Sequence, residues 1–170
     1  MAYYTQNTRL SFGEHDVWIT VDDREVNHYA ASLDESNRTI ACWIPSENGK
    51  PFAVCGQNML GQHDYALIIN LDGHPCSSHH MPRGWTRERS VSYCRTSATE
   101  VRDFIFGSIE STDDDNYLDR PASMQNVGEI KVEIYRIALS SRTVSIAFTS
   151  IPETEKVHER SKKAIDHQVK

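Results

Sequence analysis

Residues 15–23 read HDVWITVDD, and the alternation within this stretch decides the fold class. Val17, Ile19 and Val21 recur at every second position, and Trp18 falls between them. A period of two is typical of an extended strand with one face toward a core, because successive side chains of a strand point to opposite faces. The stretch therefore predicts a β-strand with an aliphatic face and a second face that carries a tryptophan.

The same period recurs in two further stretches. In GEIKVEIYRIAL, residues 128–139, Ile130, Val132 and Ile134 alternate with charged or aromatic residues, which again predicts a strand with one apolar face. YALIINLDG, residues 65–73, is nearly continuously apolar, as expected for a strand covered on both faces.

Turn-forming residues separate these runs. SENGK, residues 46–50, centres on an Asn-Gly pair that favours a tight reversal, so we expect TIACWIP and PFAVCGQ on either side of it to pair as a hairpin. Residues 74–88, HPCSSHHMPRGWTRE, contain two prolines and a glycine and predict a long irregular loop.

Taken together, about nine short strands separated by turns predict a mainly β protein, an antiparallel β-sandwich over residues 1–154. Residues 155–170 break the pattern, because Val157, Ile165 and Val169 recur at helical spacing without glycine or proline nearby. They predict a C-terminal α-helix, either part of the same domain or a docking segment. Its narrow apolar stripe needs a partner surface, which is the sandwich or another chain.

Length and charge bound the function. The 170 residues suit one domain. With 24 acidic and 18 basic residues the net charge is −6, and a negative field repels phosphate backbones, so we expect no nucleic-acid partner. No window approaches the roughly 20 apolar residues that cross a bilayer, so we expect no membrane partner.

Cysteine usage and the first residues bear on location. The opening MAYYTQNTRL has no apolar stretch that would form a signal peptide, which predicts an intracellular protein, cytoplasmic or nuclear, with reduced thiols. The four cysteines form no CxxC pair, although they would still allow three disulfide connectivities: Cys42, Cys55, Cys76 and Cys94.

One stretch gathers candidate metal ligands: His74, Cys76, His79 and His80, with His63 as a spare ligand. Neutral imidazole and thiolate are good ligands for zinc or copper. The spacing does not match the usual structural zinc pattern of two close pairs, and the alternative is a loop that carries polar histidines by chance.

A second candidate is calcium at Asp113, Asp115 and Asp119, because clustered carboxylates suit a hard cation. An EF-hand is excluded, since its glycine and glutamate positions hold Leu118 and Met124. The alternative is that the acidic run only caps a short helical turn in solvent.

Other chemistry has less support. Neither a nucleophile elbow nor a glycine-rich phosphate loop occurs in the sequence. Four aromatic residues could line a groove for sugars or peptides or could equally be packing residues: Trp18, Trp43, Trp85 and Tyr135.

Five stretches together resemble an uncharacterised fungal family, rich in basidiomycete proteins and known only as a domain of unknown function. They are VWITVDD, CWIPSENGKPFAV, FIFGSIESTDDDNYLD, GEIKVEIYRI and KVHERSKKAIDHQVK, and they run in the family's order from Val17 to Lys170. The resemblance implies a compact β-rich domain and no activity. Family chains tend to continue past the position of Lys170, so this chain is either short for the family or a trimmed domain.

The sequence thus predicts a non-enzymatic protein-interaction or ligand-binding domain without a cofactor. Its partner would be another protein or a second copy, and Val157, Ile165 and Val169 on the terminal helix would make the contact. One alternative is a metal-dependent enzyme or metal-binding module that uses residues 74–80. A further alternative is a sugar-binding sandwich assisted by calcium at the aspartates.

Overall fold

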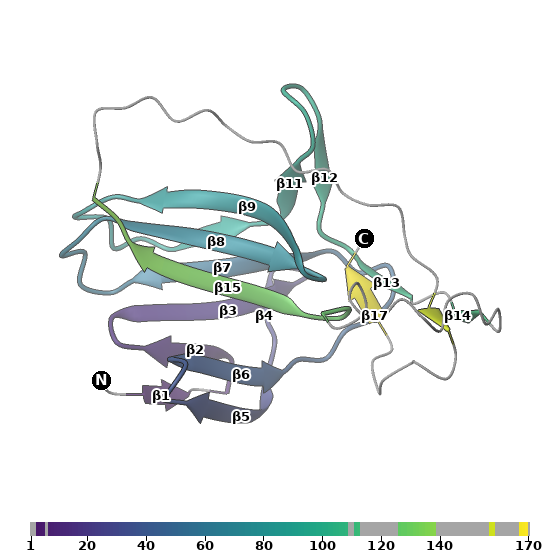
Figure 1. Cartoon of the computed structure of the whole chain (residues 1–170), viewed down its shortest axis with the longest axis horizontal. Coiled ribbons are helices and arrows are strands. Elements are labelled where there is room, and N and C mark those ends of the chain that lie inside the picture. The colour runs from purple at the N-terminus through teal and green to yellow at the C-terminus, as the bar shows by residue number, and fades with distance from the viewer. Residues whose placement is uncertain are drawn as a thin grey trace.

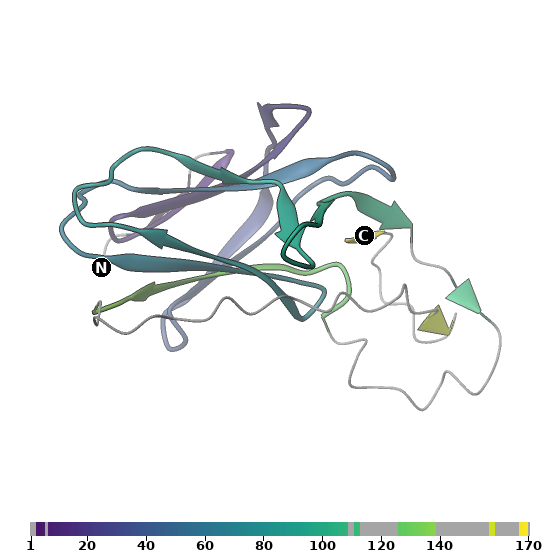
Figure 2. The same ribbon diagram turned by 90° about the horizontal axis from the view of Figure 1, so that it is seen from above.

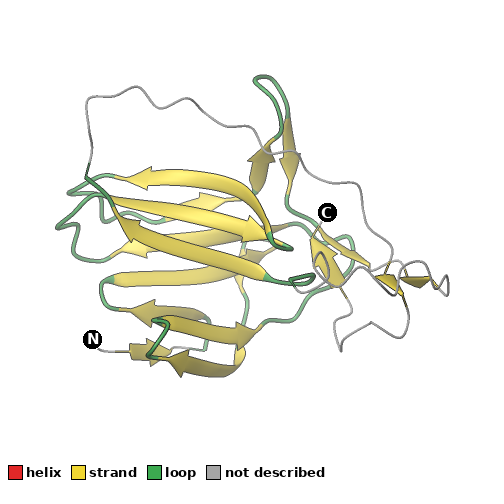
Figure 3. Cartoon of the chain, in the orientation of Figure 1, coloured by secondary structure: helices red, strands yellow, loops and turns green. Residues whose placement is uncertain are grey.

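The computed structural model describes residues 3–5, 7–108, 111–112, 126–138, 157–158 and 167–169. Strands and loops make up these residues, and no helix occurs among them (Figure 3). The described part of the chain accordingly contains no helix with the length and apolar character that a membrane crossing needs. The prediction of a mainly β protein is confirmed.

The larger sheet has six strands, all joined by antiparallel pairings, in the order β1-β2-β3-β7-β10 with β4 added to β3 (Figure 1). β3 and β7 form its centre through a continuous ladder from His15↔Asn58 to Val21↔Phe52. The strands are β1 (Tyr3–Thr5), β2 (Arg9–Phe12), β3 (His15–Val21), β4 (Arg24–Glu25), β7 (Phe52–Asn58) and β10 (Arg89–Val91).

A three-stranded antiparallel sheet in the order β15-β8-β9 lies in front of β3 and β7 in Figure 1. Its strands are β8 (Tyr65–Leu71), β9 (His74–Met81) and β15 (Ile130–Arg136). The central strand β8 buries every second residue completely and leaves the residues between them half-buried, so one face is a core face and the other is only partly covered.

Four two-stranded pairings complete the described part. Three are antiparallel and one, between β14 and β16, is parallel. The pairs are β5 (Tyr29–Asp34) with β6 (Thr39–Trp43), β11 (Tyr93–Arg95) with β12 (Val101–Asp103), β13 (Phe106–Ser108) with β17 (His167–Val169), and β14 (Ser111–Thr112) with β16 (Val157–His158). Figure 2 shows both larger sheets toward one end of the long axis and β13, β14, β16 and β17 toward the other.

One hydrophobic core joins the two larger sheets. Ile19, Phe52 and Val54 of the six-stranded sheet belong to the same buried cluster as Leu67 and Ile69 of β8. The apolar residues of β15 that alternation had marked, Ile130, Val132 and Ile134, pack against this cluster as predicted. Burial of each such side chain contributes about 1.5–3 kcal/mol, so the shared core is what holds the sheets together.

The two faces of β3 differ as the sequence predicted. Ile19 and Val21 pack into the shared core, whereas Trp18 joins a separate buried cluster with Ala53 and Cys55 of β7. Arg9 covers this second cluster, because its guanidinium lies 3.7 Å from the centroid of the Trp18 ring. The outer face of the sheet is therefore partly closed by the molecule itself.

The expected hairpin between TIACWIP and PFAVCGQ is wrong. β6 pairs with β5, and β7 pairs with β3 and β10 instead. The Asn48–Gly49 segment does not serve that hairpin, because the N–H of Gly49 donates to the carbonyl of Phe106 at 2.7 Å and Asn48 Oδ1 accepts from the N–H of Ser108 at 2.9 Å. β7 is buried along almost its entire length and is paired on both edges, with β3 and with β10.

The expected loop at residues 74–88 is wrong in its first half, because residues 74–81 form β9. Asp72 and Gly73 reverse the chain with φ of 50° and 80°, the conformation of a tight hairpin turn. Pro75 is tolerated because β9 is an edge strand of its sheet, where a missing N–H costs no ladder bond.

The helix expected over residues 155–170 is not confirmed. Its two described pieces are the short strands β16 and β17, and β17 pairs with β13 through Val169↔Phe106. The remaining residues of the segment, and the expected boundary at residue 154, lie outside the described residues. The described part also has more strands than the roughly nine predicted, because many of them, such as β4, β12 and β13, are only two or three residues long.

Candidate functional site

β9 separates the residues predicted to bind zinc. In its ladder with β8, His79 lies opposite the buried Leu67, and His80 lies opposite Ala66. Directly opposed residues share a face and neighbours along a strand point to opposite faces, so His79 and His80 cannot reach one ion. Among the residues that the structure describes, no three histidines, cysteines or acidic residues are grouped to hold a metal.

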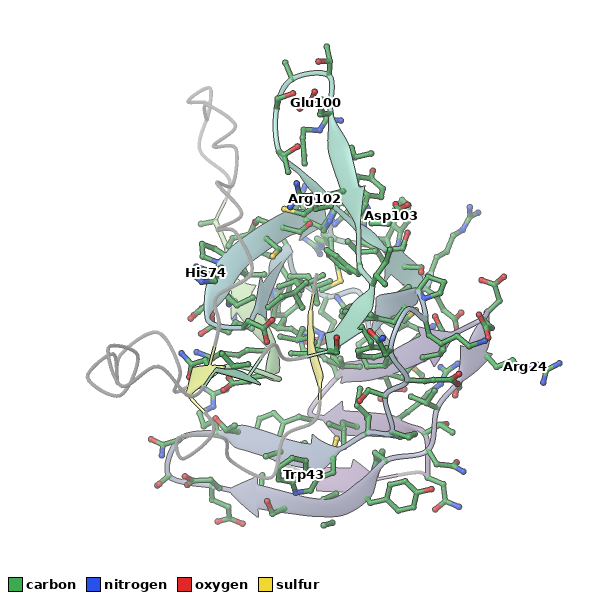
Figure 4. All side chains as sticks on the ribbon, turned by 90° about the vertical axis from the view of Figure 1, so that its right-hand side faces the viewer. Arg24, Trp43, His74, Glu100, Arg102 and Asp103 are labelled. Carbon is green, nitrogen blue, oxygen red and sulfur yellow. The ribbon has the colours of Figure 1, made fainter. Side chains whose placement is uncertain are left out.

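Each of these histidines has another partner. The Nε2 atom of His79 lies 2.5 Å from Ser77 Oγ, and the Nε2 atom of His80 lies 2.7 Å from Asp64 Oδ1. Burial lowers the pKa of His79, and the charge of Arg89 lowers it further. His74 is exposed at the turn end of β9 (Figure 4), and the spare ligand His63 has its ring 6.3 Å from that of Tyr65.

The other predicted site residues lie at or beyond the limits of the described chain. Asp113, Asp115 and Asp119 are outside the described residues, as is Ile165. Val157 and Val169 belong to β16 and β17 through their backbones. A calcium site at the aspartates and a contact surface at residues 157–169 stay predictions.

A buried polar cluster that the sequence did not suggest joins the two larger sheets. Tyr65 of β8 donates a short hydrogen bond from its hydroxyl to Glu14 Oε1, and its ring meets the His15 ring edge-on at 4.3 Å between centroids. His15 begins β3 and lies opposite Asn58, which is 0% exposed. The cluster therefore links the start of β3, the end of β7 and the start of β8.

Burial governs the titration of this cluster. It raises the pKa of Tyr65, and the hydrogen bond to Glu14 raises that pKa further. It lowers the pKa of His15, and the nearby carboxylates of Glu14 and Asp16 offset part of this shift. A phenol, a carboxylate and an imidazole would suit proton transfer, but their polar atoms Glu14 Oε2 and His15 Nδ1 are buried. Both atoms lack a hydrogen-bond partner among the described residues, so the bond between Tyr65 and Glu14 is what the cluster contributes to the sheet junction.

The solvent-facing feature with the greatest binding potential is the β5–β6 hairpin. Tyr29 and Trp43 lie directly opposite each other in its ladder and are 59% and 63% exposed. The residues that alternate with Trp43 along β6, Ile40 and Cys42, are half-buried. We call Tyr29 and Trp43 the aromatic pair; Trp43 is labelled on the hairpin in Figure 4.

This hairpin has open edges within the described residues. Neither β5 nor β6 has a second ladder partner there, although the N–H of His28, just before β5, donates to the carbonyl of Asn7 at 2.8 Å. Asp34 closes the turn, because its Oδ1 accepts from the backbone N–H groups of Ser36 at 3.0 Å and Asn37 at 3.2 Å. The hairpin is thus well formed, and no described strand extends it on either side.

The other three aromatic residues noted from the sequence differ in role. Trp18 is buried at 4% exposure beneath Arg9, which also forms ion pairs with Glu25 and with Glu88 at 3.1 Å. Trp85 is half-buried with its Nε1 donating to the carbonyl of Arg87. Tyr135 is 50% exposed, and its hydroxyl donates to Glu133. Only Trp43 of the four has an exposed aromatic residue opposite it in a described ladder.

These features define a class: a mainly β domain of mostly antiparallel sheets with an exposed aromatic pair on a two-stranded hairpin. Residues 14–170 match the model of a domain of unknown function, DUF7918, and the chain belongs to that family. No curated protein and no solved structure matches the chain.

The missed residues had weak signals in the sequence. Tyr29 would have been found by pairing VNHYAASLD with TIACWIP across the ESNR turn, which sets the two aromatic residues opposite each other. Nothing in the sequence marks Glu14, because its partner Tyr65 is 51 residues away.

Proposed function

We propose that this chain is a non-enzymatic interaction domain that binds an extended segment of a partner protein along the β5–β6 hairpin. The observation that carries the proposal is the aromatic pair, which presents two large exposed rings opposite each other on a hairpin to which no described strand is added. Added strands bind through main-chain hydrogen bonds, and side-chain contacts supply the specificity.

Energetics support this choice of surface. An isolated two-stranded hairpin is at best marginally stable in water, and a third strand adds both ladder hydrogen bonds and a packing face. Tryptophan and tyrosine are the side chains that most often dominate binding energy at interfaces, because they bury a large apolar area with few rotatable bonds. The net charge of −6 favours a neutral or basic partner segment.

The remainder of the fold serves as the scaffold. We infer that the six-stranded and three-stranded sheets are the two layers of an antiparallel β-sandwich; the shared cluster of Phe52, Val54, Leu67 and Ile69 supports this. A fungal, basidiomycete-rich distribution and an intracellular location stay predictions from the sequence.

Peptide selection tests the binding proposal. A library of random extended peptides displayed on phage is selected on the full chain and counter-selected on Trp43→Ala. We expect enriched peptides to bind the full chain and to lose at least roughly tenfold in affinity on Tyr29→Ala or Trp43→Ala, as for central aromatic contacts. Tyr135→Ala is the matched control, because it removes a similarly exposed ring from another strand and should leave the affinity unchanged.

Two outcomes would contradict the proposal. One is the failure of any peptide to depend on the aromatic pair. The other is stoichiometric zinc, copper or calcium in protein purified without a metal column, measured by elemental analysis, since this would support the metal-binding alternatives. Light scattering on the same samples separates a partner segment from a second copy, because a second copy would double the mass in a Trp43-dependent manner.

A further inference from the structure

Two of the four cysteines lie side by side although they belong to different sheets. Cys76 is on β9 and Cys94 is on β11, and the Sγ atom of Cys94 lies 2.8 Å from the backbone carbonyl oxygen of Cys76. Cys94 is 1% exposed, within the main core cluster, and Cys76 is half-buried against the same cluster. The two side chains therefore share one apolar environment.

A bulge places Cys76 at this position. In the β8–β9 ladder, Asn70 lies opposite Pro75 and Ile69 lies opposite Ser77, so Cys76 is the extra residue on β9. An extra residue bends a strand and re-aims a side chain. Here the strand contacts β11, whose central residue is Cys94.

The Cys94 thiol also affects the pKa of the Cys76 thiol. Burial raises the pKa of the Cys76 thiol to about 12, and the nearby Cys94 thiol contributes to the increase. Asp72 raises the pKa slightly further, and a backbone hydrogen bond at Leu71 opposes the shift. Each thiol donates to a backbone carbonyl: Cys76 Sγ to His74 at 3.5 Å, and Cys94 Sγ to Cys76 at 2.8 Å.

We propose that Cys76 and Cys94 are a modification site that closes to an intramolecular disulfide on exchange with a small-molecule disulfide such as oxidised glutathione. Cys76 is the more exposed of the two thiols and attacks first. Its proton passes to solvent, an S–S bond forms to one glutathione, and the other glutathione leaves as a thiolate.

Cys94 completes the exchange. Its thiolate attacks the Cys76 sulfur, the bond from Cys76 to glutathione breaks, and the second glutathione leaves. Two electrons pass from the protein to the reagent, and the two thiol protons end on the two released glutathione molecules. The product ties the edge strand β9 covalently to the β11–β12 hairpin.

The remaining cysteines provide an internal comparison. Cys55 lies on the other face of β7, in the cluster with Trp18, and its Sγ atom is 3.9 Å from Thr20 Oγ1. Cys42 is on β6, in the separate hairpin. Burial raises the pKa of Cys42 as well, so a raised pKa does not distinguish the proposed pair; proximity does.

The test is disulfide mapping of the folded full chain. The protein is incubated with oxidised glutathione and its free thiols are alkylated. It is then cut with trypsin together with a protease that cleaves before aspartate, which separates residues 72–83 from residues 90–95. We expect these two peptides to be joined, with the loss of two hydrogens, and to separate on reduction. Cys42 and Cys55 should be recovered alkylated.

Oxidation in denaturant is the matched control. In an unfolded chain the shortest loop closes most readily, so Cys42 and Cys55, the pair closest in sequence, should be favoured there. A native preference for Cys76–Cys94 that disappears in denaturant supports the proposal. Any of three results from the folded chain would overturn it: a lasting glutathione adduct on Cys76 beside a free Cys94, a link to Cys42 or Cys55, or no oxidation of either residue.

Discussion

Tyr65 shows how a single side chain joins the two larger sheets. Its backbone belongs to β8, its hydroxyl donates to Glu14 before β3, and its ring packs edge-on against His15. Within a low-dielectric interior such a hydrogen bond to a carboxylate is strong, and the unpaired carboxylate would be costly. The loss of this hydrogen bond should therefore reduce stability more than the loss of a hydrogen bond at an exposed site.

Tyr65→Phe should lower the free energy of unfolding by about 1–3 kcal/mol, because it leaves the Glu14 carboxylate half-buried without its donor. Urea unfolding monitored by circular dichroism measures the change. Tyr135→Phe is the matched control, since its hydroxyl also donates to a glutamate but at an exposed site, and it should stay within about 0.5 kcal/mol of the parent. Equal losses for the two variants would show that the Tyr65 contact has no special role.

At the scale of elements, turns decide which strands pair. The Asp72–Gly73 turn brings β9 onto β8, and both of its residues have positive φ. A Cβ at Gly73 would lie 2.8 Å from Asn126 Nδ2 and 3.1 Å from Asn126 Cβ, in the segment that leads into β15. This one glycine thus permits the close approach of the turn and the segment before β15.

Gly73→Ala should therefore cost more stability than Gly84→Ala. Both glycines have φ near +80°, where an alanine costs about 1 kcal/mol, but a Cβ at Gly84 meets nothing within 4 Å. The additional contact with Asn126 should make Gly73→Ala the worse of the two by roughly 1 kcal/mol in urea unfolding. Equal free energies of unfolding for the two variants would contradict the close packing of Asn126 against the turn.

Closure of the Cys76–Cys94 disulfide would act on a further pair of elements. A cross-link over a loop of this size restricts the unfolded chain and typically adds about 3 kcal/mol, which corresponds to a rise in Tm of roughly 5–10 °C. Differential scanning calorimetry of the oxidised and reduced chain measures the shift. Cys94→Ala treated with the same oxidant should show no rise.

The elements also show where sequence patterns succeed and where they fail. The alternation in β3 and β15 was predicted correctly, because one buried face imposes a period of two on any strand. The pairing of β6 with β7 and the loop at residues 74–81 were predicted wrongly. In the first case Asn48 and Gly49 form hydrogen bonds with β13. In the second, prolines and polar histidines are typical of loops, although residues 74–81 form an edge strand.

At the scale of the whole molecule, buried histidines make stability depend on pH. His15 and His79 both have a pKa lowered from 6.5 by burial. Below 6.5 the unfolded chain binds these protons more readily than the folded chain, so the stability is fully present above 6.5 and is lost as the pH falls toward the lowered values.

We therefore expect Tm to fall between about pH 7 and about pH 5, and to fall less in His79→Gln and in the double variant with His15→Gln. Thermal unfolding at constant ionic strength measures this. The carboxylates with lowered pKa values, such as Glu25 and Asp64, lose their contribution only below their ordinary values of 4.5 and 3.8, so they do not interfere in this range. A Tm that does not change with pH above about pH 5 would contradict the assignment of this pH dependence to His15 and His79.

The sequence by itself determined the mainly β character and the inward faces of the principal strands, because alternation is a local property that each strand shows within a few residues. It also held the residues that place the chain in its family.

Only the tertiary structure decided which strands pair, that Tyr29 faces Trp43, that Tyr65 reaches Glu14, and that Cys76 meets Cys94. It also separated His79 from His80, which are adjacent in sequence. The physical reason is that these contacts join residues far apart in the chain, or divide neighbours between two faces. They depend on sheet order and register, which many distant residues set together.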